Sequence, residues 1–172
     1  MTTEIPTRWR PRDRAAAYSE LEHPADLYLE IRGRDLPELA EHALFALYDQ
    51  ITDLEEFEAR GELTLRVGAP GLDEALRSLL SEALYHVETE GFIAVAAAVQ
   101  VDHSAALAVG GGRATGDPAA IDGWTLAAHL WGELRDQERH PPLTEIKAVT
   151  YHHLEVERVA DEDWRARVLL DV

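Results

Sequence analysis

The sequence contains no cysteine, which excludes disulfides and metal sites built from thiolates. This absence fits a reducing cytoplasm, where proteins carry few disulfides. No apolar run is long enough to cross a membrane, and the first residues lack the basic-then-apolar order of a secretory signal. At 172 residues the chain suits one domain with a real core. We therefore expect a single-domain protein of the cytoplasm.

Cations are scarce, because 16 lysines and arginines stand against 33 carboxylate side chains, for a net charge of −17. Phosphates repel a surface of this sign, so direct binding along a nucleic-acid backbone is not expected. The charge suits solubility or a basic protein partner. Residues 110–112 are glycines without the spacing of a phosphate-binding loop, and no catalytic-triad signature is present. The first absence argues against a nucleotide-binding loop, and the second weakens the case for a hydrolase that acts alone.

Apolar residues at helical spacing predict two helices. Asp35 is expected to cap the first, which continues to Ile51. The second opens at Asp73 and ends at Gly91, since glycine is favoured just after a helix. Alternating or β-branched segments predict strands, at 17–23, 27–32, 62–67, 92–101, 145–158 and from 164 to the end.

Residues 124–135 fit both a helical stripe and a strand face, and periodicity alone slightly favours the helix. Two helices among about seven strands indicate an α+β fold, with the helices packed on a mixed, largely antiparallel sheet. We expect residues 1–14 to form a flexible leader and residues 15–172 a single domain. A glycine-rich insertion is expected at 104–123.

Carboxylates occur at two places that would suit one metal ion. A predicted strand ends in Asp171 and the α-carboxylate of Val172, and the loop Glu22-His23-Pro24-Ala25-Asp26 carries more. If the two places meet, the negative charges repel one another unless a hard divalent cation neutralises them. Oxygen ligands favour Ca²⁺, Mg²⁺ or Mn²⁺ over zinc. The plainer alternative for Asp26 is a loop-capping role with backbone amides.

Four motifs, in order along the chain, resemble those of the archease family. They are Tyr18-Ser19-Glu20-Leu21-Glu22-His23-Pro24-Ala25-Asp26, the acidic helix around Leu79–Tyr85, the stretch Gly132-Glu133, His140 and Glu145–His152, and the terminal Val168-Leu169-Leu170-Asp171-Val172. The sequence departs from the family at Pro24, which replaces the usual threonine, and at His153, where glycine is common. Residues 104–123 have no family counterpart.

The resemblance implies an archease-like fold and an accessory role for an RNA ligase of the RtcB type, which joins RNA ends with GTP and divalent metal. In that role the protein is not a catalyst itself; it promotes guanylylation of the ligase and its repeated turnover in tRNA splicing. The resemblance also implies a metal ion, assigned as calcium in family structures, that Asp26, Asp171 and Val172 hold. It favours a strand at 124–135.

Four residues are candidates for contacts around the metal or with the ligase: His23, Glu22, Glu82 and Lys147. Plainer roles are open for them, since His23 suits a hydrogen bond in the core, Glu82 a solvated face, and Lys147 an ion pair. His152 and His153 are not expected to bind one ion, because neighbours on a strand point to opposite faces. Two other functions remain as alternatives, a metal-dependent hydrolase that acts alone and a chaperone-like binding protein.

Overall fold

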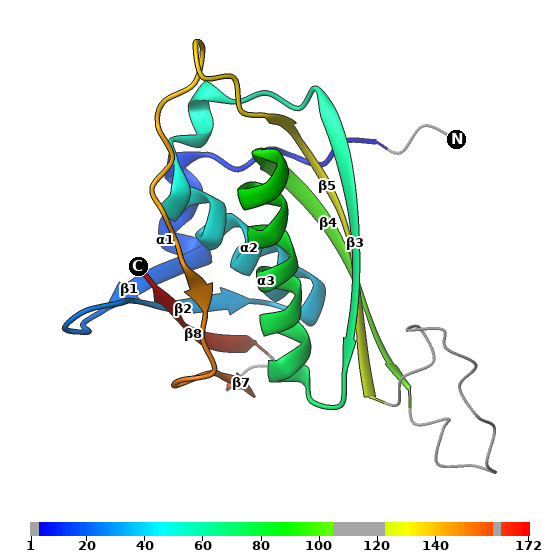
Figure 1. The fold of residues 1–172 in the computed structure, drawn as a ribbon. Helices are drawn as coiled ribbons and strands as arrows, with labels where there is room; N and C mark the ends of the chain where they lie inside the picture. Colours follow the sequence, from blue (N-terminus) through cyan, green and yellow to red (C-terminus); the bar gives the residue numbers. More distant parts are fainter. Residues whose placement is uncertain (1–3, 105–122, 160–162) are drawn as a thin grey trace.

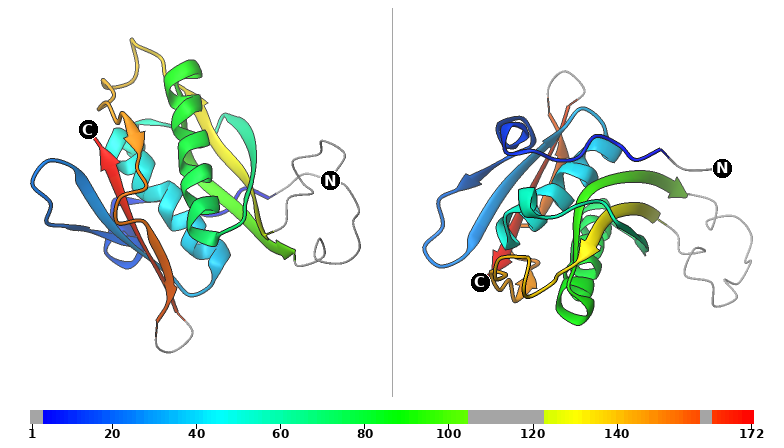
Figure 2. Two further views of the ribbon diagram at one scale, coloured as in Figure 1. Left: turned by 60° about the horizontal axis from the view of Figure 1, so that its bottom comes forward. Right: turned by 90° about the horizontal axis from the view of Figure 1, so that it is seen from above.

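The structure, a computed structural model, describes residues 4–104, 123–159 and 163–172. Its strands form two sheets with two long helices between them (Figures 1 and 2). The first sheet contains, in spatial order, β1 (Tyr18–Leu21), β2 (Leu27–Gly33), β8 (Trp164–Asp171) and β6 (Ala148–Val149), with β7 (Glu155–Arg158) also paired to β8. The second contains β3 (Gly61–Ala69), β5 (Gly123–Leu134) and β4 (Phe92–Ser104). All pairings between described strands are antiparallel, which confirms the α+β class with the strands divided over two sheets.

Both long helices lie where the sequence predicts them, α2 at Leu36–Ile51 and α3 at Leu72–Glu90. The Asp35 side chain accepts a hydrogen bond of 2.8 Å from the Glu38 amide, as an N-cap does. Gly91 follows α3 with φ 73°, a left-handed conformation that glycine adopts without steric cost. The shorter elements are α1 (Arg14–Ala17) and the 3₁₀ turns η1 (Pro11–Asp13) and η2 (Leu54–Glu56). Within the described residues, no helix combines the length and the apolar character that a membrane span requires.

The segment 124–135, whose sequence fits both a helical stripe and a strand face, lies in strand β5 up to Leu134. It pairs with β3 on one side and with β4 on the other, so it is the central strand of the second sheet. Its apolar residues lie on both faces, since Leu130 and its neighbour Trp131 are both buried, and strict alternation is therefore lost. Gly132 lets β4 approach closely, because a Cβ there would lie 1.9 Å from the Ile93 carbonyl oxygen. The strand prediction is confirmed.

The described part of the expected leader, residues 4–14, lies against the rest of the domain. Trp9 is only 8% exposed, and its ring stacks on Phe45 of α2 with 5.4 Å between centroids. The Trp9 backbone N–H donates to the Val95 carbonyl of β4 at 2.8 Å, and the Arg8 guanidinium donates to the Phe57 carbonyl at 2.9 Å. One buried indole removes enough apolar surface from water to anchor a segment otherwise poor in apolar residues.

The single strand predicted for residues 145–158 is wrong. Two short strands, β6 and β7, are separated by a turn at 150–154. His153 lies in this turn with φ 54°, a left-handed conformation that interrupts an extended strand. The predicted hairpin with β8 is confirmed for β7. Of the expected insertion, residues 104 and 123 belong to β4 and β5, and the remainder, 105–122, lies outside the described residues.

Candidate functional site

The two places expected to share a metal ion lie at the same end of the first sheet. Strands β2 and β8 are antiparallel with Leu27 opposite Leu170. Asp26, just before β2, and Asp171, the last residue of β8, are therefore neighbouring positions across the strands. The turn between β1 and β2 and the C-terminal end lie side by side in both views of Figure 2. Because side chains alternate along a strand, Asp171 shares the outer face of β8 with Arg167, while Asp26 lies in the bend just before β2.

Strand β8 is held on both edges, which fixes the main chain of Asp171. Strand β2 lies along one edge, and β6 and β7 lie along the other. The Lys147 backbone N–H donates to the Asp171 carbonyl oxygen at 2.7 Å, and the Thr150 N–H donates to the Leu169 carbonyl at 3.0 Å. Val172 follows the strand and is 40% exposed. The candidate Lys147 therefore reaches this end through its backbone, while the residue as a whole is exposed.

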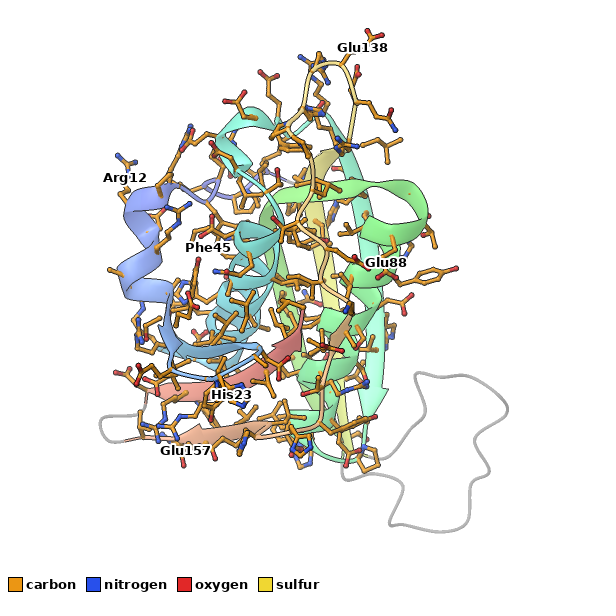
Figure 3. All side chains as sticks on the ribbon, turned by 60° about the vertical axis from the view of Figure 1, so that its left-hand side comes forward. Arg12, His23, Phe45, Glu88, Glu138 and Glu157 are labelled. Carbon is orange, nitrogen blue, oxygen red and sulfur yellow. The ribbon has the colours of Figure 1, made fainter. Side chains whose placement is uncertain are left out.

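His23, labelled in Figure 3, lies in the turn before β2 with two rings beside it. The centroids of the Tyr28 and His153 rings each lie 6.2 Å from that of His23. Its Nδ1 lies 3.7 Å from Asp26 Oδ2, beyond hydrogen-bond distance. That nitrogen is buried and has no hydrogen-bond partner within the described ranges. Buried polar atoms are normally satisfied, so such an atom is often completed by water or an ion.

The other candidates do not gather around Asp26. Glu22 is exposed in the β1–β2 turn. Glu82 lies on α3, where its carboxylate is 3.7 Å from His86. His152 and His153 lie in a turn rather than on a strand, with 5.9 Å between ring centroids. In the part of the chain that the structure describes, no three His, Asp or Glu side chains are arranged to hold a metal.

The expected donor set fits a hard cation in its chemistry, although it contains only two carboxylate side chains. Asp26 and Asp171 would supply oxygen ligands, and the third donor would be a main-chain or terminal oxygen of Val172. Carboxylate, carbonyl and water oxygens are the ligands that Ca²⁺ prefers in proteins. The Asp26 side chain is 25% exposed, so an ion can approach it from solvent. The donor types thus suit a hard cation, although the described side chains form no complete ligand group at this end of the sheet.

The outer face of the first sheet carries charges that are paired across its strands. Arg167 of β8 donates to Glu30 of β2 at 3.1 Å and lies 3.7 Å from Glu155 of β7. Such cross-strand pairs stabilise a sheet and balance its charge. Among the described residues, no arginine or lysine forms an ion pair with Asp26 or Asp171. Asp26 and Asp171, at the end of this sheet, thus lack the arginine partners that balance the carboxylates along the strands.

A second polar cluster, whose role the sequence does not predict, is buried at the far end of β5. Glu133 is 6% exposed and accepts hydrogen bonds from the Glu58 amide at 3.0 Å, His140 Nε2 at 2.9 Å and Arg139 Nη2 at 3.1 Å. The Asp136 amide donates to His140 Nδ1 at 2.8 Å, so the neutral ring carries its proton on Nε2. The cluster closes the loop between β5 and the segment that leads to β6.

The charge of Glu133 is stabilised despite its burial. Burial alone would raise the pKa of Glu133, but the hydrogen bonds from the Glu58 amide, Arg139 and His140 outweigh it and lower that pKa. The His140 ring also stacks on Phe57, with 3.9 Å between centroids. The motif Gly132-Glu133 with His140 was visible in the sequence, but only the fold shows that its two side chains meet.

Comparison with known proteins gives consistent matches along the chain. A sequence model of the archease protein family matches residues 18–172. Protein archease of Pyrococcus furiosus is 30% identical over 156 residues, which cover 90% of this chain and 98% of that protein. Protein archease of Methanosarcina mazei is 31% identical over 155 residues, which cover 90% and 95% of the two chains.

Solved structures also resemble this fold, among them one determined in solution and one determined by crystallography. A protein of Methanobacterium thermoautotrophicum, solved in solution, has a TM-score of 0.71 at 27% identity and covers 91% of this chain and 99% of its own. A crystal structure from Thermotoga maritima, called an archease and possible chaperone, has a TM-score of 0.51 at 19% identity and covers 90% and 96%. The second likeness concerns the fold alone.

Proposed function

The chain belongs to the archease family, and on this premise we propose that it is a metal-binding activator of an RNA ligase of the RtcB type. The proposal rests on the antiparallel register of β2 and β8, which brings Asp26 and Asp171 to one open end of the first sheet. Two carboxylates that pair with no lysine or arginine among the described residues fit a divalent ion of oxygen preference.

Asp26, Asp171 and an oxygen of Val172 would hold the ion. We expect Ca²⁺ at this site in structures, and Mg²⁺ or Mn²⁺ would also suit these oxygen ligands. When bound, the ion neutralises carboxylates that otherwise repel one another. The residues of this chain then act by position: β6 and β2 hold the main chain of β8 on both edges, so the ligands are presented from a rigid strand. His23 and Glu22 stand in the same turn as Asp26 and are candidates for contacts around the ion.

The catalysis itself belongs to the partner. A ligase that handles RNA presents basic surface to phosphates, and a protein of net charge −17 complements it. We propose that the end of the first sheet with Asp26 and Asp171 abuts the metal- and nucleotide-binding centre of the ligase. This contact promotes guanylylation and repeated turnover in tRNA splicing. Lys147 and Glu82 are candidates for contacts with the ligase.

The two alternative functions have less support. A hydrolase that acts alone needs a general base poised beside an open metal position, and His23 Nδ1, at 3.7 Å from Asp26, is the nearby group of that kind. A chaperone with broad clients needs a contiguous apolar patch. In the described residues the large exposed apolar side chains are few and widely spread along the chain, namely Ile5, Tyr85, Leu134, Tyr151 and Val172.

The test is to measure guanylylation and multiple-turnover ligation by the ligase with this protein, with its Asp26→Asn and Asp171→Asn variants, and with Asp102→Asn as a control. Asparagine keeps a capping oxygen but removes the charge, so it separates a metal role from a loop-capping role. We expect the wild type and the control to stimulate turnover and to bind Ca²⁺ or Mn²⁺ in calorimetry, and both site variants to lose both properties. Asp102 is an exposed carboxylate on β4.

A variant extended beyond Val172 sharpens the test, because it converts a terminal carboxylate to an amide and leaves every side chain in place. Unchanged guanylylation and turnover with the wild-type protein would refute the proposal. Hydrolysis without the ligase would favour the stand-alone enzyme, and suppressed aggregation of many unrelated proteins would favour the chaperone.

A further inference from the structure

One side of α3 carries an exposed tyrosine, Tyr85, and the turn after β6 brings a second, Tyr151, against Arg77 of the same helix. We define the α3 ridge as Arg77, Ser81 and Tyr85 of α3 together with Tyr151 of the turn after β6. Tyr151 is 67% exposed and Tyr85 is 55% exposed, although both are large aromatic side chains. Exposed tyrosines are favoured at protein interfaces, where the ring is buried and the hydroxyl finds a partner.

Arg77 of α3 holds the Tyr151 side chain in place. The Arg77 guanidinium carbon lies 3.8 Å from the centroid of the Tyr151 ring. The same guanidinium donates to the Val149 carbonyl of β6 at 2.9 Å and to the Tyr151 hydroxyl at 3.1 Å. The ring is thus oriented before any partner arrives, and little side-chain entropy remains to be lost on binding.

The spacing along α3 places Arg77, which holds Tyr151, at one end of the ridge and Tyr85 at the other. Residues four apart lie on one side of a helix, so Arg77, Ser81 and Tyr85 form a row. Arg77 and Tyr85 are eight residues apart, which is about 12 Å along the axis. The small side chain of Ser81 lies between them in this row.

The charge around the ridge is uncompensated, in contrast to the outer face of the first sheet. Helix α3 carries five carboxylates and one arginine. In the described ranges, its carboxylates form ion pairs only with His86, at 3.7 Å from Glu82 and 3.1 Å from Glu90. Glu88 and Glu90 stand in the last turn, where the helix dipole disfavours negative charge (Glu88 is labelled in Figure 3). This arrangement lowers helix stability and raises attraction for cations.

We propose that the α3 ridge and the carboxylates beside it form the docking surface for a basic segment of the partner protein. This inference rests on the proposed function, in which the partner is the RNA ligase. Lysine or arginine side chains of that segment meet Glu82 and Glu88, and an apolar side chain enters between Tyr151 and Tyr85. Strand β6 lies between the ridge and β8, so a partner docked on α3 is held next to Asp171.

The experiment measures the affinity of the full-length protein for the ligase by biolayer interferometry at low and at high salt. We expect the Tyr85→Ala/Tyr151→Ala variant to bind about 30-fold more weakly or worse, as for the loss of interface hot spots. Ile5→Ala removes a comparably exposed apolar side chain from a different segment and should leave the affinity within about twofold. Salt should slow association of the wild type, because the attraction is electrostatic.

Glu88→Lys separates docking from misfolding. Lysine in the last turn of α3 suits the helix dipole, so the melting temperature should rise while the affinity for the ligase falls about tenfold. Glu56→Lys, the same charge change on η2, should leave the affinity unchanged.

Tyrosine variants that bind as the wild type does would overturn the docking surface, and they would leave the proposed function standing if the wild type stimulates ligation. A wild type that binds no ligase would overturn both.

Discussion

Replacing Glu133 by alanine removes the acceptor at the centre of the buried cluster on β5. The side chain is 6% exposed and accepts three hydrogen bonds, of 2.9–3.1 Å. Without it, the Nε2–H of the buried His140 and the part-buried Glu58 amide lose their acceptor. Each unsatisfied buried donor costs about 1–3 kcal/mol. The Arg139 side chain is 46% exposed and can turn to water, so it adds little.

We therefore expect Glu133→Ala to lower the free energy of unfolding by about 4 kcal/mol, within the range for breaking a buried charged network. For a chain of this size the melting temperature should fall by about 8–16 °C. Urea unfolding followed by circular dichroism measures the change. Glu133→Gln keeps an acceptor and removes the charge, so it should lose about half as much. A loss below about 1 kcal/mol for the alanine variant would refute the structural role of the cluster.

The same side chain makes stability depend on pH. The folded-state pKa of Glu133 lies below its ordinary value, because its hydrogen bonds outweigh the effect of burial. Its contribution is therefore fully present above the ordinary glutamate range and is lost as the pH falls through the folded-state pKa. We expect the wild type to lose more stability on acidification than Glu133→Gln. Parallel curves for the two proteins would contradict this sign.

Two further predictions concern the backbone. His153 has φ 54°, so His153→Val should destabilise the protein by about 1–2 kcal/mol. His153→Gly should change the stability by no more than about 0.5 kcal/mol, because glycine adopts this conformation freely. Equal urea midpoints for the two variants would contradict the left-handed turn. A Cβ at Gly132 would meet the Ile93 carbonyl oxygen at 1.9 Å, so Gly132→Ala should cost about 3 kcal/mol in thermal unfolding. Gly61→Ala is its matched control, since a Cβ there lies 3.6 Å from the Gly132 carbonyl oxygen, an ordinary contact.

Sequence patterns predicted an element correctly where its own residues decide its conformation. The Asp35 cap, the apolar spacing up to Ile51 and the glycine at position 91 all favour the helices that the structure contains. They were insufficient where pairing with another strand decides between helix and strand. The 124–135 segment has a helical stripe, but pairing on both edges makes it a strand.

The candidate metal site divides in the same way. The residue types at Asp26 and Asp171 predict oxygen ligands for a hard cation, and the family resemblance assigns them the role. Their proximity follows from the register of β2 on β8, which no local pattern encodes, because it depends on hydrogen bonds between residues far apart in the chain. The buried nitrogen of His23 next to Asp26 could not be inferred from sequence for the same reason.

By itself, the sequence determined the helices, the acidic charge and the family, because each depends on residue type and short spacing. Only the tertiary structure decided that Trp9 anchors the leader, that His153 bends the segment between β6 and β7, and that Glu133 meets His140. It also decided that Arg77 holds Tyr151 upright beside α3. Such contacts form between distant segments only when the chain folds, since their energy comes from burial and from hydrogen bonds that water would otherwise make.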